Sequence, residues 1–177
     1  MENIRILALS GSLRKKSYNS ALINAVAKLA PNRIKIVIFD EMDTLPLFNP
    51  DRESENINVI RKLKNELKKS NGLLISSPEY AHGISGVLKN ALDWLVSGDE
   101  FPYIPVALVN TSPRATHAQI ALREVISTMS GNIIESASMV VPLLGTDFDA
   151  NAIINDDKIS QYIIKKINIF KDEIINC

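Results

Sequence analysis

The chain has 177 residues and a formal net charge of zero, because 20 Lys and Arg balance 20 Asp and Glu. This length fits a single domain, 1–177, and the balanced charge argues against a nucleic-acid partner, which usually requires a basic surface. Cys177 is the only cysteine and His82 and His117 are the only histidines, so the composition argues against a disulfide framework, a His/Cys metal site and an internal thiol nucleophile.

Short apolar segments alternate with amphipathic segments along the chain. In chain order, we predict a strand at 4–9, a helix at 18–30, a strand at 34–39, a helix at 57–69, a strand at 73–76, a helix with apolar residues between 87 and 95, a strand at 105–110, a helix at 116–129, a strand at 136–142 and a helix at 156–175. A polar loop with two prolines is expected between 40 and 56. This alternation favours an α/β fold in which helices cover both faces of a parallel sheet.

The sequence shows no sign of a membrane segment or a secretion signal. No apolar run approaches the roughly 18 residues that a membrane helix needs. The first predicted strand begins close to Met1, which leaves no room for a signal peptide. We therefore expect a cytoplasmic protein that has no membrane partner.

The segment SGSLRKKSYNS, residues 10–20, connects the first predicted strand to the first helix. It combines hydroxyl and amide donors with three positive charges and contains no carboxylate. The first backbone N–H groups of a helix are unpaired and carry partial positive charge, so an anion such as a phosphate can bind there. Arg14 could add a charge-assisted hydrogen bond. The alternative is a helix start capped by Ser17 or Asn19, with a solvated basic turn.

Other phosphate-binding motifs on this architecture do not match. The GxxxxGK[ST] loop is absent, and Gly11 is the only one of the three glycines that a dinucleotide fingerprint needs. The loop also lacks the cysteine nucleophile of a low-molecular-weight tyrosine phosphatase. Ser10 and Ser77 stand where a response-regulator receiver would need carboxylates. The first loop is therefore predicted to bind an anion mainly through side chains.

Two further loops follow predicted strands at the sheet edge where doubly wound folds bind ligands. The segment SSPEYAHGISG (76–86) offers the flat ring of Tyr80 and backbone N–H groups, which could border a planar ring system. The segment NTSPRATHAQ (110–119) could donate hydrogen bonds to a polar ring edge. Each segment is also consistent with an ordinary structural turn, in which the histidines and Arg114 would be hydrogen-bonded or solvated.

The two segments GSLRKKSYNSAL and SPEYAHGISGVLKNALDW together resemble the NADPH-dependent FMN reductase family of flavodoxin-like proteins. The resemblance extends from the first predicted strand to the fifth. It implies a flavodoxin-like three-layer α/β fold, with a five-stranded parallel sheet in the order 2-1-3-4-5. It also implies FMN as the bound cofactor and NADPH or NADH as the electron donor.

The resemblance also implies a set of site residues. The first loop would surround the FMN phosphate with Ser10, Ser12, Arg14, Ser17, Asn19 and Ser20. The second loop would border the isoalloxazine and ribityl chain with Pro78, Glu79, Tyr80, Ala81, His82 and Gly83, and the third would approach the pyrimidine edge with Thr111, Ser112 and Arg114. Many relatives have Asn where Ala81 stands, so that flavin contact would fall to the backbone here. No metal and no acid–base catalytic pair are expected, because the flavin carries the chemistry.

The function that the resemblance implies is that of an FMN-dependent NAD(P)H oxidoreductase. A hydride would pass to FMN, and two electrons would then pass to a small acceptor in a ping-pong cycle. Candidate acceptors are a quinone, an azo or nitro compound, a metal oxyanion or free flavin. The main alternative is a flavodoxin-type FMN electron carrier without NADPH reactivity, but such carriers are typically strongly acidic and this chain is neutral. A relative without flavin is disfavoured by the intact first loop, and a homodimer or homotetramer is expected.

Overall fold

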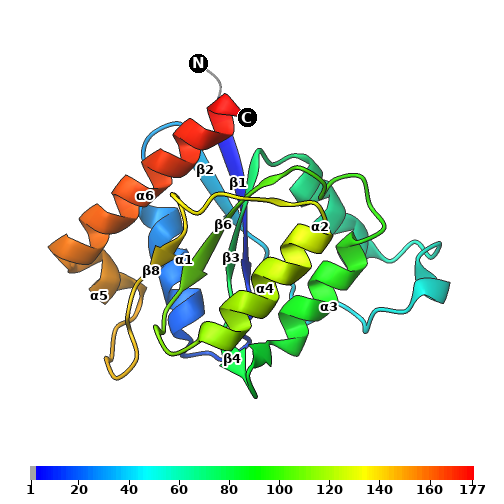
Figure 1. Cartoon of the computed structure of the whole chain (residues 1–177), viewed down its shortest axis with the longest axis horizontal. Helices are drawn as coiled ribbons and strands as arrows, with labels where there is room; N and C mark the ends of the chain where they lie inside the picture. Colours follow the sequence, from blue (N-terminus) through cyan, green and yellow to red (C-terminus); the bar gives the residue numbers. More distant parts are fainter. Residues whose placement is uncertain (1–2) are drawn as a thin grey trace.

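The computed structural model describes residues 3–177 and shows a parallel sheet between two layers of helices (Figure 1). The sheet is formed by β1 (Ile4–Ser10), β2 (Ile34–Ile38), β3 (Gly72–Ser76), β6 (Pro105–Asn110), β7 (Asn132–Ile133) and β8 (Met139–Val140), and a separate hairpin by β4 (Glu79–Tyr80) and β5 (Gly83–Ile84). The helices are α1 (Tyr18–Leu29), α2 (Asn58–Lys68), α3 (Gly86–Leu95), α4 (Thr116–Thr128), α5 (Ala150–Asn155) and α6 (Asp157–Asn176), with a short 3-10 turn, η1, at Pro50–Arg52. The expectation of no signal peptide depends on Met1 and Glu2, which lie outside the described residues.

The sheet has the strand order β2-β1-β3-β6-β7, and all of its paired strands run parallel. Renumbered by the five predicted strands, this is the order 2-1-3-4-5, so the predicted flavodoxin-like fold is confirmed. Strand order reverses between β1 and β3, and ligands of doubly wound folds bind outside the carboxyl ends of the strands at such a reversal. The loops after β1 and β3 therefore lie where a ligand is expected.

The fifth strand is shorter than predicted and is divided in two. At this edge of the sheet β7 and β8 both pair with β6; β8 lies within the predicted range 136–142, and β7 lies before it. The chain turns between them, where the Ser138 N–H bonds to the Ile134 carbonyl at 3.0 Å. The Ser138 side chain accepts the Leu108 N–H at 3.1 Å, so a hydroxyl replaces a strand carbonyl in the ladder. The pattern of polar and apolar residues at 136–142 did not indicate this turn.

Each face of the sheet has its own hydrophobic core. Leu7 and Leu9 of β1 face the core that packs under α2, α3 and α4. Ile6 and Ala8, one residue out of phase, face the core under α1, α5 and α6. This alternation follows from the period of two residues in a strand, and it explains why β1 is apolar throughout. The two helical layers are visible on either side of the sheet in Figure 1.

Candidate functional site

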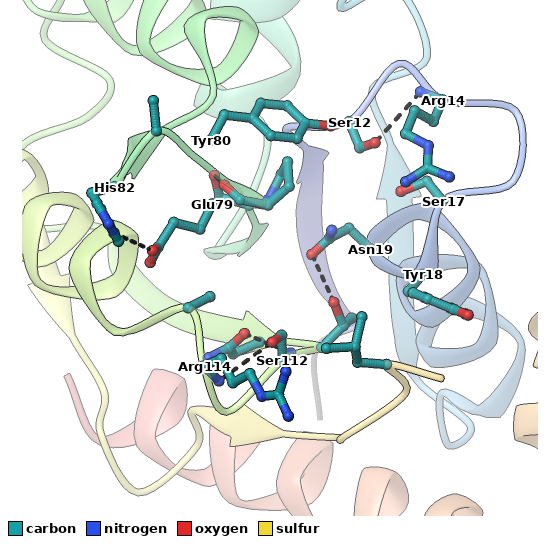
Figure 2. A pocket seen from close by; sticks show the side chains of 17 residues that line it. Ser12, Arg14, Ser17, Tyr18, Asn19, Glu79, Tyr80, His82, Ser112 and Arg114 are labelled. Carbon is teal, nitrogen blue, oxygen red and sulfur yellow. Dashed lines mark hydrogen bonds and ion pairs between the residues drawn. The ribbon is translucent and has the colours of Figure 1, made fainter. Parts of the chain in front are cut away.

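The loops after β1, β3 and β6 surround one cavity of about 460 Å³, shown in Figure 2. Its volume falls in the range of small-molecule sites, about 300–1,000 Å³. The lining residues are Ser12, Arg14, Ser17, Tyr18, Asn19, Ser77, Pro78, Glu79, Tyr80, Ala81, His82, Asn110, Thr111, Ser112, Arg114, Ala115 and Leu144. The structure thus brings together three loops that the sequence places far apart.

The first loop presents hydrogen-bond donors and a positive charge at the start of α1. Ser17 is the N-cap of the helix, and its hydroxyl accepts the Ser20 N–H at 3.3 Å. Arg14 lies beside Ser17 in the cavity wall, and Ser12 lies further along the same loop (Figure 2). The segment Ser-Tyr-Asn-Ser-Ala at 17–21 carries no acid, so the helix N-terminus keeps its partial positive charge. This end of the cavity suits an anion.

Asn19 connects all three loops from the first turn of α1. Its Oδ1 accepts the hydroxyl of Ser76 at 2.7 Å and that of Thr111 at 3.4 Å, and the residue is only 7% exposed. Since the carbonyl oxygen is used by these two hydroxyls, the two N–H donors of the amide remain for the cavity that Asn19 lines. A side chain predicted as a ligand contact thus also holds the loops together.

Three of the predicted residues do not line the cavity. Ser10 and Ser20 bond to each other through their hydroxyls at 2.9 Å, behind the first loop. Ser10 also accepts the Ser12 N–H at 3.4 Å, so the pair shapes the loop that carries Ser12. Gly83 pairs with Tyr80 in the hairpin. Direct contact of these three residues with a cofactor stays a prediction, and their visible contacts are structural.

The second loop forms the β4–β5 hairpin, where the sequence pattern predicted only a turn into a helix. Its two central residues, Ala81 and His82, have φ angles of 48° and 59°. Two positive φ values in a two-residue loop match a type I′ turn, which usually contains Asn-Gly or Asp-Gly. Without those residues the pattern contains no hairpin signal. The hairpin places Tyr80, 49% exposed, on the cavity wall (Figure 2).

Replacing Ala81 by asparagine is expected to stabilise the protein by up to about 1 kcal/mol, because asparagine tolerates the left-handed region better than alanine. Urea unfolding of the purified protein would measure the change. Ala81→Val is the matched comparison, since a β-branched side chain at φ 48° should destabilise. A lower unfolding free energy for Ala81→Asn than for the native chain would contradict this account of the turn.

Glu79 turns away from Arg14 and toward His82, as Figure 2 shows. Its Oε2 accepts the N–H of Ala118 in α4 at 2.9 Å, and its Oε1 lies 3.1 Å from Nδ1 of His82. The His82 ring packs edge-on against the His117 ring, with centroids 4.4 Å apart. The hydrogen bond from the Ala118 N–H lowers the pKa of the Glu79 carboxyl, and the hydrogen bond with His82 lowers it further by a smaller amount. Desolvation opposes both, but the pKa stays below its ordinary value. The group is therefore ionised at neutral pH.

The third loop is a tight turn that ends at α4. Asn110 Oδ1 accepts the Ser112 N–H at 2.9 Å, and Ser112 Oγ accepts the Arg114 N–H at 3.3 Å. These side-chain turns are typical of Asn and Ser, which bond to backbone two residues further on. They place Thr111, Ser112 and Arg114 in the cavity wall. The position predicted for this loop agrees with the structure.

The segment after β8 also reaches the cavity, and the sequence pattern did not predict it. The Leu143 N–H bonds to the Thr111 carbonyl at 2.9 Å, and the Tyr18 hydroxyl donates to the Thr146 carbonyl. These bonds bring Leu144, 57% exposed, to the cavity wall. Tyr18, Ser77, Asn110 and Ala115 were missed as well. Ligands of doubly wound folds bind outside the carboxyl ends of the strands, so the segment after the fifth predicted strand, which contains Leu144, could also have been predicted to reach the site.

The charges in the wall favour an anionic ligand. Arg14 and Arg114 line the cavity, and Glu79, the only acid of the described lining, is bonded to α4 and His82. Among residues 3–177, no group of three or more His, Cys, Asp or Glu side chains could hold a metal ion. In the same range, no helix is long and apolar enough to cross a membrane. A phosphate beside α1 and a flat ring beside the hairpin would fit these walls.

Comparison with known families now identifies this arrangement. The family model described as NADPH-dependent FMN reductase matches residues 4–143, from the start of β1 to the cavity segment after β8. The chain belongs to this family. It is accordingly an oxidoreductase of the NADPH-dependent FMN reductase type, with FMN and NAD(P)H as the family's cofactors. The matched range includes all three loops, so the predicted family is confirmed.

Individual relatives agree with the family. The chain is 28% identical over 172 residues to an NAD(P)H-dependent FMN reductase of Pseudomonas aeruginosa, covering 94% of this chain and 92% of the relative. It is 34% identical over 172 residues to a 2-hydroxy-1,4-benzoquinone reductase of a Burkholderia species, covering 90% of each. The solved structure of FerB, a flavoenzyme NAD(P)H:(acceptor) oxidoreductase from Paracoccus denitrificans, superposes with a TM-score of 0.78, at 22% identity and 98% coverage of both chains. This last likeness supports the fold.

Proposed function

We propose that this member of the NADPH-dependent FMN reductase family binds FMN in the cavity and uses NAD(P)H to reduce a small acceptor. Bound FMN would supply the redox chemistry, which is hydride acceptance followed by two-electron transfer. The observation that carries the proposal is the shared cavity: a donor-rich, positively charged end at α1 and a hairpin carrying an aromatic ring line the same space. The protein's own part is to bind and orient its ligands.

Four residues of the first loop would bind the phosphate. Ser12, Ser17 and Asn19 supply neutral donors, and Arg14 supplies a charged one. All four line the cavity, and Asn19 is fixed by the hydroxyls of Ser76 and Thr111. Its orientation is therefore set before a ligand arrives, which lowers the entropic cost of binding.

The second and third loops would hold the flavin ring between them. The hairpin residues Pro78, Tyr80, Ala81 and His82 would border the ring and the ribityl chain, and Thr111, Ser112 and Arg114 would approach its polar edge. Both sets line the cavity. The ring would leave its outer face open, so NAD(P)H and then the acceptor would use the same opening in turn. This shared opening is what a ping-pong cycle requires.

A quinone is the acceptor class with the most direct support. The Burkholderia relative is named as a benzoquinone reductase and is 34% identical over most of both chains. A planar quinone also suits the apolar rim offered by Leu144 and Tyr80. Azo and nitro compounds, metal oxyanions and free flavin remain the competing acceptors, and steady-state rates with each at saturating NADPH would rank them.

Replacing Arg14 by alanine is expected to weaken FMN binding tenfold or more. A hydrogen bond to a charged group contributes about 1.5–3 kcal/mol, which corresponds to roughly a 10- to 100-fold change in affinity. Fluorescence titration of the FMN-free protein measures the dissociation constant. Lys16→Ala is the matched control, because it removes the same charge from an exposed loop position outside the cavity lining. Equal losses in the two variants would mean that only the general positive charge matters.

The proposed activity is tested by adding NADPH to the FMN-loaded protein without oxygen. The visible absorption of bound flavin should bleach far faster than that of free FMN at the same concentration. If FMN binds tightly but stays yellow, the electron-carrier alternative is favoured. If the protein never retains FMN, the proposal fails at its first step.

We further propose a homodimer or homotetramer in the cytoplasm. Leu47, in the 40–56 loop, and Tyr103, at the end of the Trp94–Tyr103 segment, are each 82% exposed, and a partner copy would cover them. Light scattering coupled to size-exclusion chromatography would give the mass directly, and a monomer at micromolar concentration would contradict the proposed assembly.

A further inference from the structure

The carboxylate of Glu79 is bonded to protein groups on both of its oxygens. We infer that Glu79 is a positioning residue: it caps the N-terminus of α4 and thereby fixes the second loop relative to the third. The inference rests on the proposed function, because its consequence concerns how the FMN ring is held between those loops. Glu79 also lines the cavity, so its expected contact with the flavin stays a prediction beside this positioning role.

The first step is the cap. Ala115 occupies the N-cap position of α4, and an alanine side chain has no atom that could accept a hydrogen bond. Ala118 is the third residue of α4. Its N–H bonds instead to Glu79, which lies 39 residues earlier in the chain. A carboxylate is favoured at a helix N-terminus by the partial positive charge there. A residue of the hairpin therefore does what a local serine or aspartate usually does.

The second step is the number of links between the hairpin and α4. Besides the bond to Ala118, Glu79 contacts His82 Nδ1, and His82 packs on the His117 ring in the first turn of α4. The Glu79 side chain is only 15% exposed, so water competes little for its oxygens. One oxygen of the carboxylate thus bonds to the helix start, and the other bonds to the histidine that packs on the same helix. Removing the carboxylate breaks the direct bond and leaves His82 without its hydrogen-bond partner in the hairpin.

The third step is the effect on the cavity. The cavity is lined on one side by the hairpin, with Tyr80 and His82 (Figure 2). On another side it is lined by the segment just before α4, with Ser112 and Arg114. The space between them is where a flat ring would lie, and its width depends on how the hairpin sits on α4. The partial positive charge at the N-terminus of α4 also offsets part of the negative charge of Glu79, which weakens the repulsion between this carboxylate and an anionic cofactor.

The test compares Glu79→Ala with Glu79→Gln. Glutamine keeps an oxygen that can accept the Ala118 N–H, whereas alanine keeps none. Glu124→Ala serves as the control, since it removes a carboxylate from the same helix and lies outside the cavity lining. Hydrogen exchange at the Ala118 amide, measured on the FMN-free protein, should become about fivefold faster in Glu79→Ala and stay near the native rate in Glu79→Gln.

The second readout is the dissociation constant for FMN, with the KM for NADPH beside it. We expect Glu79→Ala to weaken FMN binding about three- to tenfold, and Glu79→Gln to restore it to within about twofold of native. Unchanged exchange at Ala118, or unchanged FMN affinity, in Glu79→Ala would overturn the inference. So would an equal loss in both variants, which would mean that the charge acts directly on the flavin. A native protein without FMN affinity would instead overturn the proposed function, while exchange at Ala118 still decides the cap.

Discussion

Asn19→Asp is expected to lower FMN affinity at least about 100-fold while leaving the fold intact. One carboxylate oxygen can still accept the hydroxyls of Ser76 and Thr111, as Oδ1 of Asn19 does at 2.7 and 3.4 Å. The other oxygen replaces the amide nitrogen that faces the cavity. It removes two donors and adds a negative charge beside the proposed phosphate position.

The size of this effect follows from two contributions. Losing a hydrogen bond to a charged group costs about 1.5–3 kcal/mol. Repulsion between a carboxylate and a phosphate about 4 Å apart adds up to about 4 kcal/mol at the effective dielectric constant of a protein surface. Even partial screening of the second contribution leaves a total near 3 kcal/mol, or about 100-fold.

Two comparisons separate this account from a general disturbance of the site. Asn24→Asp makes the same chemical change on an exposed position of α1, and it should leave FMN affinity within about threefold of native. Riboflavin lacks the phosphate, so its weaker binding should change much less in Asn19→Asp than FMN binding does. If riboflavin and FMN lose affinity equally, the amide of Asn19 does not face the phosphate.

The parallel sheet and the three cavity loops could be predicted because they depend on patterns that the local sequence carries, whereas the strand order was implied by the family resemblance. Apolar strands such as 4–9 and 105–110 signal a buried parallel sheet, and polar residues just after them must lie at its carboxyl edge. Ser12, Arg14 and Arg114 are therefore predicted to share one site from the amino-acid sequence alone. The family resemblance then adds the identity of the cofactor.

The features that sequence analysis missed depend on tertiary contacts. The hairpin turn at Ala81 and His82 uses positive φ angles without the usual asparagine or glycine. Its geometry is held by Glu79 and by α4, which lie apart in the chain. Ser10 and Ser20 look like ligand donors in the sequence, but they bond to each other. A hydroxyl pattern predicts donors, and only the packing shows which of them are already used.

Gly11→Ala is expected to destabilise the protein by about 1–3 kcal/mol, the usual cost of overfilling a packed region. A Cβ at this position would lie 2.8 Å from Ser85 Oγ, 3.1 Å from Leu88 Cβ and 3.3 Å from Ser77 Oγ. Ser85 cannot simply turn away, because its hydroxyl caps α3 by accepting the Leu88 N–H at 3.3 Å. The end of β1 is also held in place, since the Gly11 N–H bonds to the Ser76 carbonyl at 2.8 Å.

Urea unfolding of the FMN-free protein measures this cost without any ligand. Gly86→Ala is the matched control: no described atom lies within 4 Å of a Cβ there, and in α3 the change should be neutral or slightly stabilising. In a Ser85→Ala background, which removes the nearest atom, Gly11→Ala should cost clearly less than it does alone. If Gly11→Ala lowers the free energy of unfolding equally in both backgrounds, the steric clash is with Leu88 instead of Ser85. Gly11, in the first loop, lies against Ser77 and Ser85 of the second loop segment. The added methyl group should therefore push the two loops apart. That displacement would move the phosphate end of the cavity away from its ring end and weaken FMN binding.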